Sequence, residues 1–411
     1  MFTFFITFLL LFTCLSGSFG AGTGFDTRLH QIIKPYSFSL IAWEINTLNY
    51  ETIPSLIGNN KNSGDVSSVL EYFASAARVR TLSANLDATR RAETVQADKV
   101  TTLEVELAGA IERKTELESM AERVIEKQIR EVLTEEGIYN PFVGAGNFPP
   151  VDFKLTAPPH LLVVSPRDRI ESIRETMLKS DLSSDDMENI EAKVDALNVS
   201  SLVTGIGGLG VTYPTFVSNE MDLRSTINAA TEEWLHQYLA FRPLGFRYVL
   251  DVTGLIRNYD IACMNETLAG MVSKEIGDLV YDRYYSELLP GDSQPEITEV
   301  QHNEFDFNWE MRQIRIQVDS LLSMGKVDEA EYYMNEKRDF LESQGYYIRK
   351  LNQAYFAFYG TYADSPTSID PIGTEMKKLR HESTSLKEFL DRVSIMTGRE
   401  ALENAAGSQE N

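Results

Sequence analysis

The stretch Thr231-Glu-Glu-Trp-Leu-His-Gln-Tyr-Leu239 (TEEWLHQYL) lies between a glycine-rich segment and the phrase FRPLG. Residues four positions apart share one face of a helix, so Glu232 and His236 point the same way and could bind one cation together. Glu233 projects about 100° further round the helix, where a general base could take a proton from water. One predicted helical turn therefore carries two metal-binding groups and a base.

The phrase MNETLAG supplies a third ligand from another predicted helix. Glu266 lies 30 residues after His236, and this helix can pack antiparallel to the first through the intervening FRPLGFRY turn. Zinc accepts carboxylate oxygen as well as imidazole nitrogen, so Glu232, His236 and Glu266 would form an open three-ligand site. A second carboxylate reduces the net charge at the metal, which makes its water less acidic and shifts the preference towards harder ions.

These residues resemble the gluzincin metallopeptidases, whose pattern is His-Glu-x-x-His followed by Asn-Glu-x-x. Glu232-Glu-Trp-Leu-His236 and Asn265-Glu266-Thr-Leu-Ala match that pattern except at the first histidine. Longer phrases also resemble a group of bacterial membrane-associated proteins with gluzincin-like sites. These phrases are PPHLLVVSPRDRIE (158–171), GIGGLGVTYP, WLHQYLAFRPLG, MNETLAGMVSKEIG and LNQAYFAFYGTYADSP (351–366).

The resemblance implies a role for each matching position. His236 and Glu266 would be metal ligands, and Glu232 would occupy the position of the first histidine ligand. The cofactor would be zinc or another divalent ion in place of zinc. Glu233 would be the base that activates water for attack on a peptide carbonyl. The strand before the active helix would hold the substrate backbone by β-addition. Its residues here are Gly207, Gly208, Leu209 and Gly210.

Two tyrosines on a later predicted helix are weaker candidates. Tyr355 and Tyr359 share a face at four-residue spacing and could stabilise an oxyanion. Aromatic residues at this spacing also suit packing in a core. Both interpretations remain open at this point.

Two departures from the gluzincin pattern point the same way. Glu232 replaces the first histidine, and Gly270 stands where gluzincins commonly carry an aspartate that orients that histidine. A loss of both residues fits one coordinated change. If no metal binds, Glu232, Glu233 and Glu266 crowd together, which should raise at least one of their pKa values.

Three functions are consistent with these residues. The first is a gluzincin-like metallopeptidase homologue with an altered or degenerate metal site. The alternative is a non-enzymatic peptide-binding or envelope interaction protein, a pseudopeptidase. The third is a helical protein without a cleft, in which the four site residues would lie apart. The remaining histidines show no ligand spacing; they are His30, His160, His302 and His381.

Other sequence features narrow the class of protein. The net charge of -23 would repel a phosphate backbone and excludes nucleic acid as an expected partner. Gly205, Gly207 and Gly210 fit the spacing G-x-G-x-x-G, but no helix is predicted to open there, so a dinucleotide site is not expected. Only Cys14 and Cys263 are present, so no disulfide should remain once the N-terminal segment is removed.

The first 22 residues contain no charged side chain. Their apolar run of about 15 residues has the length of a signal-peptide core, but the usual basic n-region is missing, so an uncleaved membrane anchor is the alternative. We expect an extracytoplasmic protein, secreted or anchored through this segment. Its partners would be a peptide or protein substrate or ligand and, through the N-terminal segment, a membrane.

The pattern as a whole predicts an α+β fold that is mostly α, with a small central sheet packed on a zincin-like pair of helices. After residues 1–22, the predicted parts are a strand with a long helical arm, a gluzincin-like core, a helical C-terminal subdomain and a disordered tail. Their ranges are 36–145, 146–290, 300–403 and 404–411. Within them we expect strands over 36–48 and 161–165, and helix over 65–136, 224 onward, 265–288, 310–362 and 373–403.

Overall fold

The computed structural model of this 411-residue chain describes residues 24–38, 65–91, 97–139, 147–210, 212–289 and 305–407. The described residues form mostly α-helix with a few short strands, which confirms the predicted α+β class that is mostly α. The N-terminal segment 1–22, most of the predicted strand 36–48 and the last four residues lie outside the described ranges.

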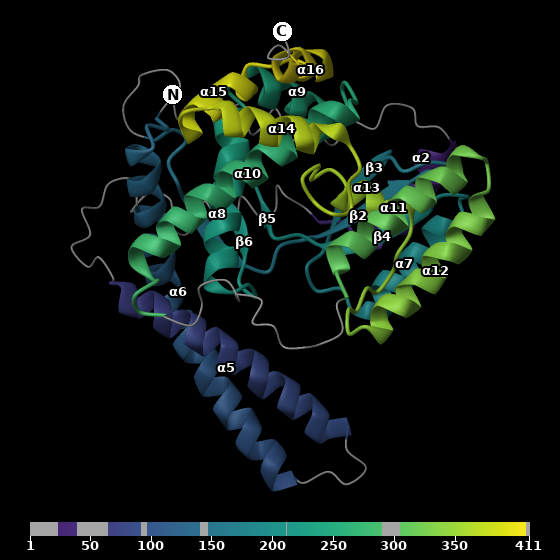
Figure 1. The fold of residues 1–411 in the computed structure, drawn as a ribbon. Helices are drawn as coiled ribbons and strands as arrows, with labels where there is room; N and C mark the ends of the chain where they lie inside the picture. Colours follow the sequence, from purple (N-terminus) through teal and green to yellow (C-terminus); the bar gives the residue numbers. More distant parts are fainter. Residues whose placement is uncertain are drawn as a thin grey trace.

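The predicted helical arm is a pair of helices, α5 (Val66–Arg91) and α6 (Ala97–Glu135). They pack together and project from the rest of the molecule, at the lower left of Figure 1. The predicted helical range ended at residue 136, and Gly137 follows the end of α6; its φ of +73° is the left-handed conformation that suits a helix C-terminus. The last turns of α6 belong to the largest apolar core, so the arm is continuous with the body.

The strands form two three-stranded sheets instead of the one central sheet expected. The first has the order β1 (Phe153–Thr156), β6 (Thr215–Ser218), β5 (Gly208–Leu209), with β1 and β6 parallel. The second is antiparallel, in the order β3 (Arg174–Leu178), β2 (His160–Ser165), β4 (Ser200–Gly205). Because two residues join β4 to β5, the two sheets meet along the glycine-rich segment.

Helices cover the two faces of the second sheet. On one face lie α2 (Gly24–Ile33) and α7 (Ser184–Asp195), and the short 3-10 helix Lys34–Tyr36 leads to a bridge between Ser37 and Leu178. The other face contacts α13 (Gln353–Tyr359) through Val163 and Leu202. The predicted strand 161–165 therefore lies at the centre of this sheet as β2.

Two buried glutamates of α6 cover the outer edge of β1. The backbone N–H of Leu155 donates to Glu122 at 2.8 Å, and that of Phe153 donates to Glu126 at 3.1 Å. Lys154 also contacts Glu122 at 3.1 Å. These carboxylates satisfy donors that an edge strand would otherwise leave without partners.

The largest core joins α8 (Leu223–Leu239) and α10 (Tyr259–Tyr284). The two helices approach closely at Gly277, where a Cβ would lie 1.8 Å from the side-chain oxygen of Asn228. Helices α9 (Pro243–Val252), α14 (Pro371–Glu382), α15 (Leu386–Ser394) and α16 (Arg399–Gly407) surround the pair.

Two details of this core differ from the sequence prediction. The FRPLGFRY segment is not a turn, because Pro243 occupies the start of α9, a position that proline favours. The tail predicted to be disordered from residue 404 instead continues helix α16 to Gly407.

The predicted helix 310–362 is three helices. Gly325 and Gly345, with φ values of +72° and +91°, end α11 (Phe307–Ser323) and α12 (Val327–Ser343), and α13 follows. These three elements share a second core. Among the described residues, no helix has both the length and the apolar character needed to cross a bilayer.

Candidate metal centre

Helices α8 and α10 bring the three predicted ligands together. Glu232, His236 and Glu266 each offer an atom that lies within 4.8 Å of the other two. The Nε2 atom of His236 is 3.7 Å from a carboxylate oxygen of Glu266. Since ligand atoms bound to one zinc ion at about 2.1 Å lie at most roughly 4 Å apart, side-chain shifts below about 1 Å would complete the coordination.

A hydrogen bond fixes the orientation of the His236 ring. Its Nδ1 atom is 2.9 Å from the side-chain oxygen of the fully buried Asn265, which precedes Glu266 on α10. Because an amide oxygen only accepts, Nδ1 carries the proton in this bond. Nε2 is on the side of the ring that faces Glu266, where it can bind a cation. Asn265 therefore has the role expected of a residue that positions a metal-binding histidine.

Tyr248 on α9 supports both His236 and Glu266. Its ring stacks on the His236 ring with centroids 5.7 Å apart, and its hydroxyl donates a hydrogen bond to Glu266. Burial and the neighbouring Glu266 carboxylate raise the pKa of Tyr248 well above its ordinary value, so the hydroxyl keeps its proton. The sequence analysis missed this tyrosine because it lies in the segment expected to be a turn.

Glu232 provides the test of whether these residues suit a cation. Its Oε1 atom is buried and has no hydrogen-bond partner among the described residues. Burial raises the pKa of Glu232 to about 7; the His236 ring opposes this shift and the Glu266 carboxylate adds to it. A buried carboxylate with an unpartnered oxygen, together with a nearby imidazole and a second carboxylate, is a donor set that fits a divalent cation.

Glu233 lies beside the glycine-rich segment, and two glycines make room for it. A Cβ at Gly208 would lie 2.5 Å from the Glu233 side chain, and one at Gly210 would lie 2.8 Å from it. Burial raises the pKa of Glu233 to about 8, while a hydrogen bond from the Gly210 backbone lowers it. Burial works to lower the pKa of His236, but the surrounding carboxylates outweigh it and raise that pKa.

The expected crowding of glutamates is therefore present: burial raises the pKa of both Glu232 and Glu233, and the neighbouring carboxylates add to this shift.

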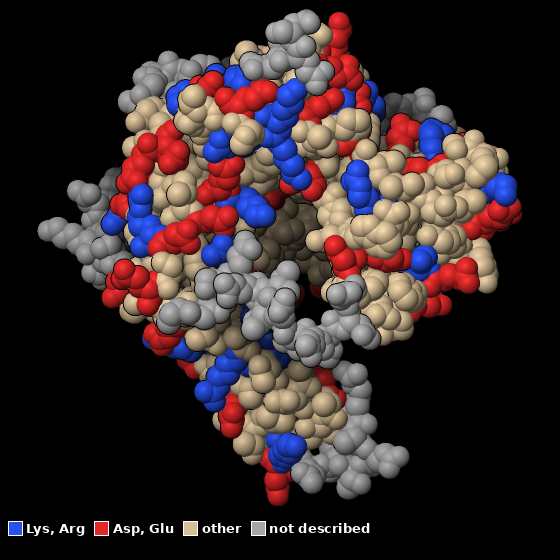
Figure 2. Space-filling model, in the orientation of Figure 1, with Lys and Arg blue, Asp and Glu red and all other residues tan. Residues whose placement is uncertain are grey.

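A cavity of about 480 Å³ opens onto these residues. Figure 2 shows the recess in the middle of the molecule, between the helix pair and the sheet β3-β2-β4. All four residues predicted to bind substrate line it: Gly207, Gly208, Leu209 and Gly210. Gly208 and Leu209 form β5 at the edge of its sheet, so the outer side of this strand lies next to the cavity.

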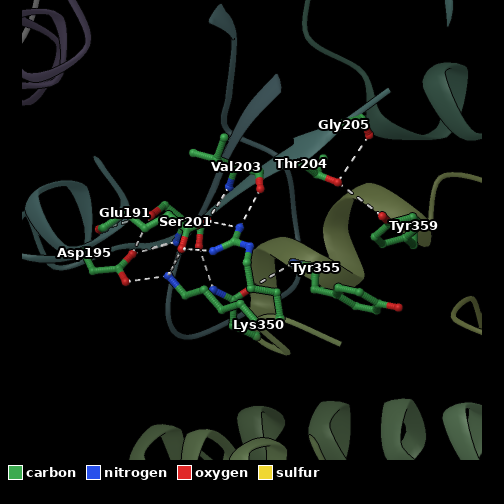
Figure 3. Close-up of polar contacts among 11 residues, drawn as sticks. Glu191, Asp195, Ser201, Val203, Thr204, Gly205, Lys350, Tyr355 and Tyr359 are labelled. Atoms are coloured by element: carbon green, nitrogen blue, oxygen red, sulfur yellow. Dashed lines mark hydrogen bonds and ion pairs between the residues drawn. The ribbon is translucent and has the colours of Figure 1, made fainter. Parts of the chain in front are cut away.

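The two tyrosines of α13 occupy different places. Tyr359 lines the cavity, and its hydroxyl lies 3.2 Å from that of Thr204 on β4 (Figure 3). Tyr355 is not among the residues that line the cavity; its ring packs against Tyr359, with centroids 4.5 Å apart, and against the second core. The core interpretation thus describes Tyr355, and an oxyanion role for Tyr359 stays a prediction.

A polar network holds α13 against β4 and so positions Tyr359. Asn352 caps α13 and donates to the carbonyl of Ser201, while Arg349 donates to the carbonyl of Val203 and to Glu191. Glu191 in turn accepts from the backbone N–H of Val203 at 2.6 Å. Side chains therefore cover the outer edge of β4 as far as Val203, and Gly205 is the first residue of this strand to line the cavity.

Tyr362 is a second residue that the sequence analysis missed. It lines the cavity three residues after Tyr359, and its ring lies over Gly270 of α10, where a Cβ would be 3.5 Å from a ring carbon. Its hydroxyl lowers the pKa of Glu232 through a hydrogen bond. The signal available in the sequence was a tyrosine in the phrase LNQAYFAFYGTYADSP, which contains two others of equal standing.

The other histidines of the described residues lie on separate elements. His160 on β2 contacts the carbonyl of Lys179 at 3.0 Å, as suits a structural role, while His30 and His381 belong to α2 and α14. His302 lies outside the described ranges. None of these three joins the group of ligands found around His236.

Comparison of the chain with family models, with curated proteins and with solved structures returns no match.

Proposed function

We propose that this chain is a metal-dependent peptidase of gluzincin type whose site has Glu232, His236 and Glu266 as ligands. The observation that carries the proposal is the cluster of Glu232, His236 and Glu266 beside a cavity, in which ligand atoms lie within 4.8 Å of one another and the Oε1 atom of Glu232 has no hydrogen-bond partner among the described residues. A buried carboxylate oxygen with no partner costs stability unless a cation binds it. The Asn265 and Tyr248 contacts hold the other two ligands for the same purpose.

The residues of this chain divide the work of hydrolysis. Zinc, or a harder divalent ion favoured by the second carboxylate, would supply Lewis acidity at the scissile carbonyl when bound. Glu233, held beside Gly208 and Gly210, takes a proton from the attacking water and can pass it to the leaving amine. The free side of β5 pairs with the substrate backbone, and the cavity takes a side chain next to the scissile bond.

A peptide library separates an active peptidase from a protein that only binds peptides. The full chain, loaded with zinc or manganese, is expected to cleave a subset of peptides, and Glu233→Gln should lower the rate by about 10²- to 10⁴-fold. Glu220→Gln is the matched control, since Glu220 is exposed and does not line the cavity. Peptide binding that persists with a chelator, together with no cleavage, would reject the peptidase and favour the pseudopeptidase.

Secretion or anchoring through residues 1–22 is part of the same proposal.

A further inference from the structure

Gly270 and Tyr362 form a contact that connects the two departures from the gluzincin pattern. Gly270 lies on α10 one turn after the ligand Glu266, at the position where the resemblance implies an aspartate. The ring of Tyr362 occupies the space beside it, with two ring carbons 3.5 and 3.7 Å from the position of a Cβ. A Cβ alone would make an ordinary van der Waals contact there, whereas the carboxylate of an aspartate would collide with the ring.

The backbone on either side of Tyr362 fixes the position of this residue. Helix α13 ends at Tyr359, and the carbonyl of Thr361 and the N–H of Ala363 both contact Thr267 on α10, at 3.4 and 2.9 Å. These two bonds on either side of Tyr362 hold its backbone against α10. Thr267 is fully buried, so the attachment is part of the core.

The Tyr362 side chain faces the carboxylates of the centre. It lines the same cavity as Glu232, and its hydroxyl forms a hydrogen bond with the Glu232 carboxylate. A hydroxyl can only donate to an ionised carboxylate. The Glu232 carboxylate receives this donor, while its Oε1 atom has no hydrogen-bond partner among the described residues and can bind a cation.

We infer that Tyr362 is the positioning residue for Glu232, and that Gly270 is small because the Tyr362 ring occupies the place of the missing aspartate. The histidine with its aspartate on α10 has been exchanged for a glutamate with a tyrosine from the α13 segment. This inference rests on the proposed metal centre. It states that the exchange preserved an oriented three-ligand site.

Cobalt binding to the full chain tests the inference, because Co²⁺ replaces zinc and its visible absorption reports the geometry of its ligands. Tyr362→Phe is expected to lower the Co²⁺ affinity by about 10- to 100-fold and to change the absorption spectrum. Tyr259→Phe is the control, because Tyr259 also lines the cavity but its hydroxyl contacts Cys263. It should leave the affinity within about 3-fold of the wild type, because its hydroxyl contacts Cys263 instead of a ligand of the centre.

Two substitutions at Gly270 distinguish positioning from general packing. Gly270→Ala should bind Co²⁺ like the wild type, and Gly270→Asp should weaken binding as Tyr362→Phe does, because it displaces the ring. In a Glu232→His, Gly270→Asp variant, a further Tyr362→Phe change should have no effect on affinity. Equal affinity and spectrum in the wild type and Tyr362→Phe would overturn this inference alone, whereas no Co²⁺ binding by the wild type would overturn the metal centre with it.

Discussion

Glu191 on α7 and Glu232 on α8 are two glutamates that the fold removes from solvent in opposite ways. Glu191 is 3% exposed and receives two bonds from Arg349, at 2.9 and 2.6 Å, together with one from the Val203 backbone. Lys350 lies 3.6 Å away as a second cation (Figure 3). Glu232 has the acids Glu233 and Glu266 nearby, and one of its oxygens has no partner among the described residues.

The two glutamates show two different surroundings that this fold gives to a buried carboxylate. Where a carboxylate fastens α13 to β4, the fold supplies arginine, lysine and backbone donors. Where carboxylates gather around the cavity, the fold supplies an oriented histidine and leaves one oxygen of Glu232 without a donor among the described residues. Because a buried charge is costly when it is not compensated, the second arrangement is the one that a cation from solution would stabilise.

The largest effect on stability is expected at Glu191, the glutamate that has cationic partners. Arg349→Ala leaves Glu191 buried without its main cation and should lower the free energy of unfolding by about 3–5 kcal/mol. Chemical denaturation measures this change. Arg338→Ala is the control, since Arg338 pairs with the exposed Asp339 and should change stability by less than about 0.5 kcal/mol. Equal effects of the two variants would mean that Glu191 does not need its partner, and the comparison would fail.

Glu122 is 3% exposed, and its partners are the lysine Lys154 and the backbone N–H of Leu155. It therefore lies between Glu191, which has two cations, and Glu232, which has an oxygen without a partner among the described residues. Burial raises the pKa of Glu122 to about 7, against an ordinary value of 4.5, and Lys154 only partly offsets this. The unfolded chain therefore loses this proton at lower pH than the folded chain. Stability should fall as pH rises from 4.5 to 7, by up to about 3 kcal/mol from this group.

Urea denaturation of the wild type and Glu122→Gln at pH 4.5, 6 and 8 isolates this contribution from those of other acids. A glutamine keeps an oxygen for the Leu155 N–H but does not titrate, so the variant should gain stability relative to the wild type as pH rises. A constant difference between the two proteins across this range would show that the Glu122 pKa is not raised.

A smaller effect is expected where the glycine-rich segment meets the candidate metal centre. Gly208→Ala places a methyl group 2.5 Å from the Glu233 side chain and should cost about 1–3 kcal/mol of stability, with loss of the proposed peptidase activity as Glu233 shifts. Gly207→Ala is a closely matched control, because its methyl group would meet only Met221, at 3.8 Å. If both alanine variants behave alike, the position of Glu233 does not depend on this strand.

The sequence was sufficient to predict the relative positions of side chains that lie on the same helix. The spacing of Glu232, Glu233 and His236 on α8, and the presence of Glu266 on a second helix, led to a cluster that the structure contains. The stop of α6 at Gly137 followed from the same local rules. In each case the information lies within a few residues of chain.

The remaining features depend on long-range packing, which has no local signature. Tyr248 and Tyr362 reach the cluster from α9 and from the segment after α13, and neither stands out among the tyrosines of the chain. The break of residues 310–362 into three helices depends on glycines at positive φ, which an apolar periodicity does not show. The two sheets were predicted as one because β4 and β5 are nearly continuous in sequence.

Metal content of the purified full chain tests the central claim most directly. After exposure to zinc or manganese and removal of excess ion, mass spectrometry of the wild type should find one metal ion per chain. His236→Ala and Glu266→Ala should each lose it, whereas Arg338→Ala should keep it. Absence of metal from the wild type under these replete conditions would contradict the claim that Glu232, His236 and Glu266 form a metal centre.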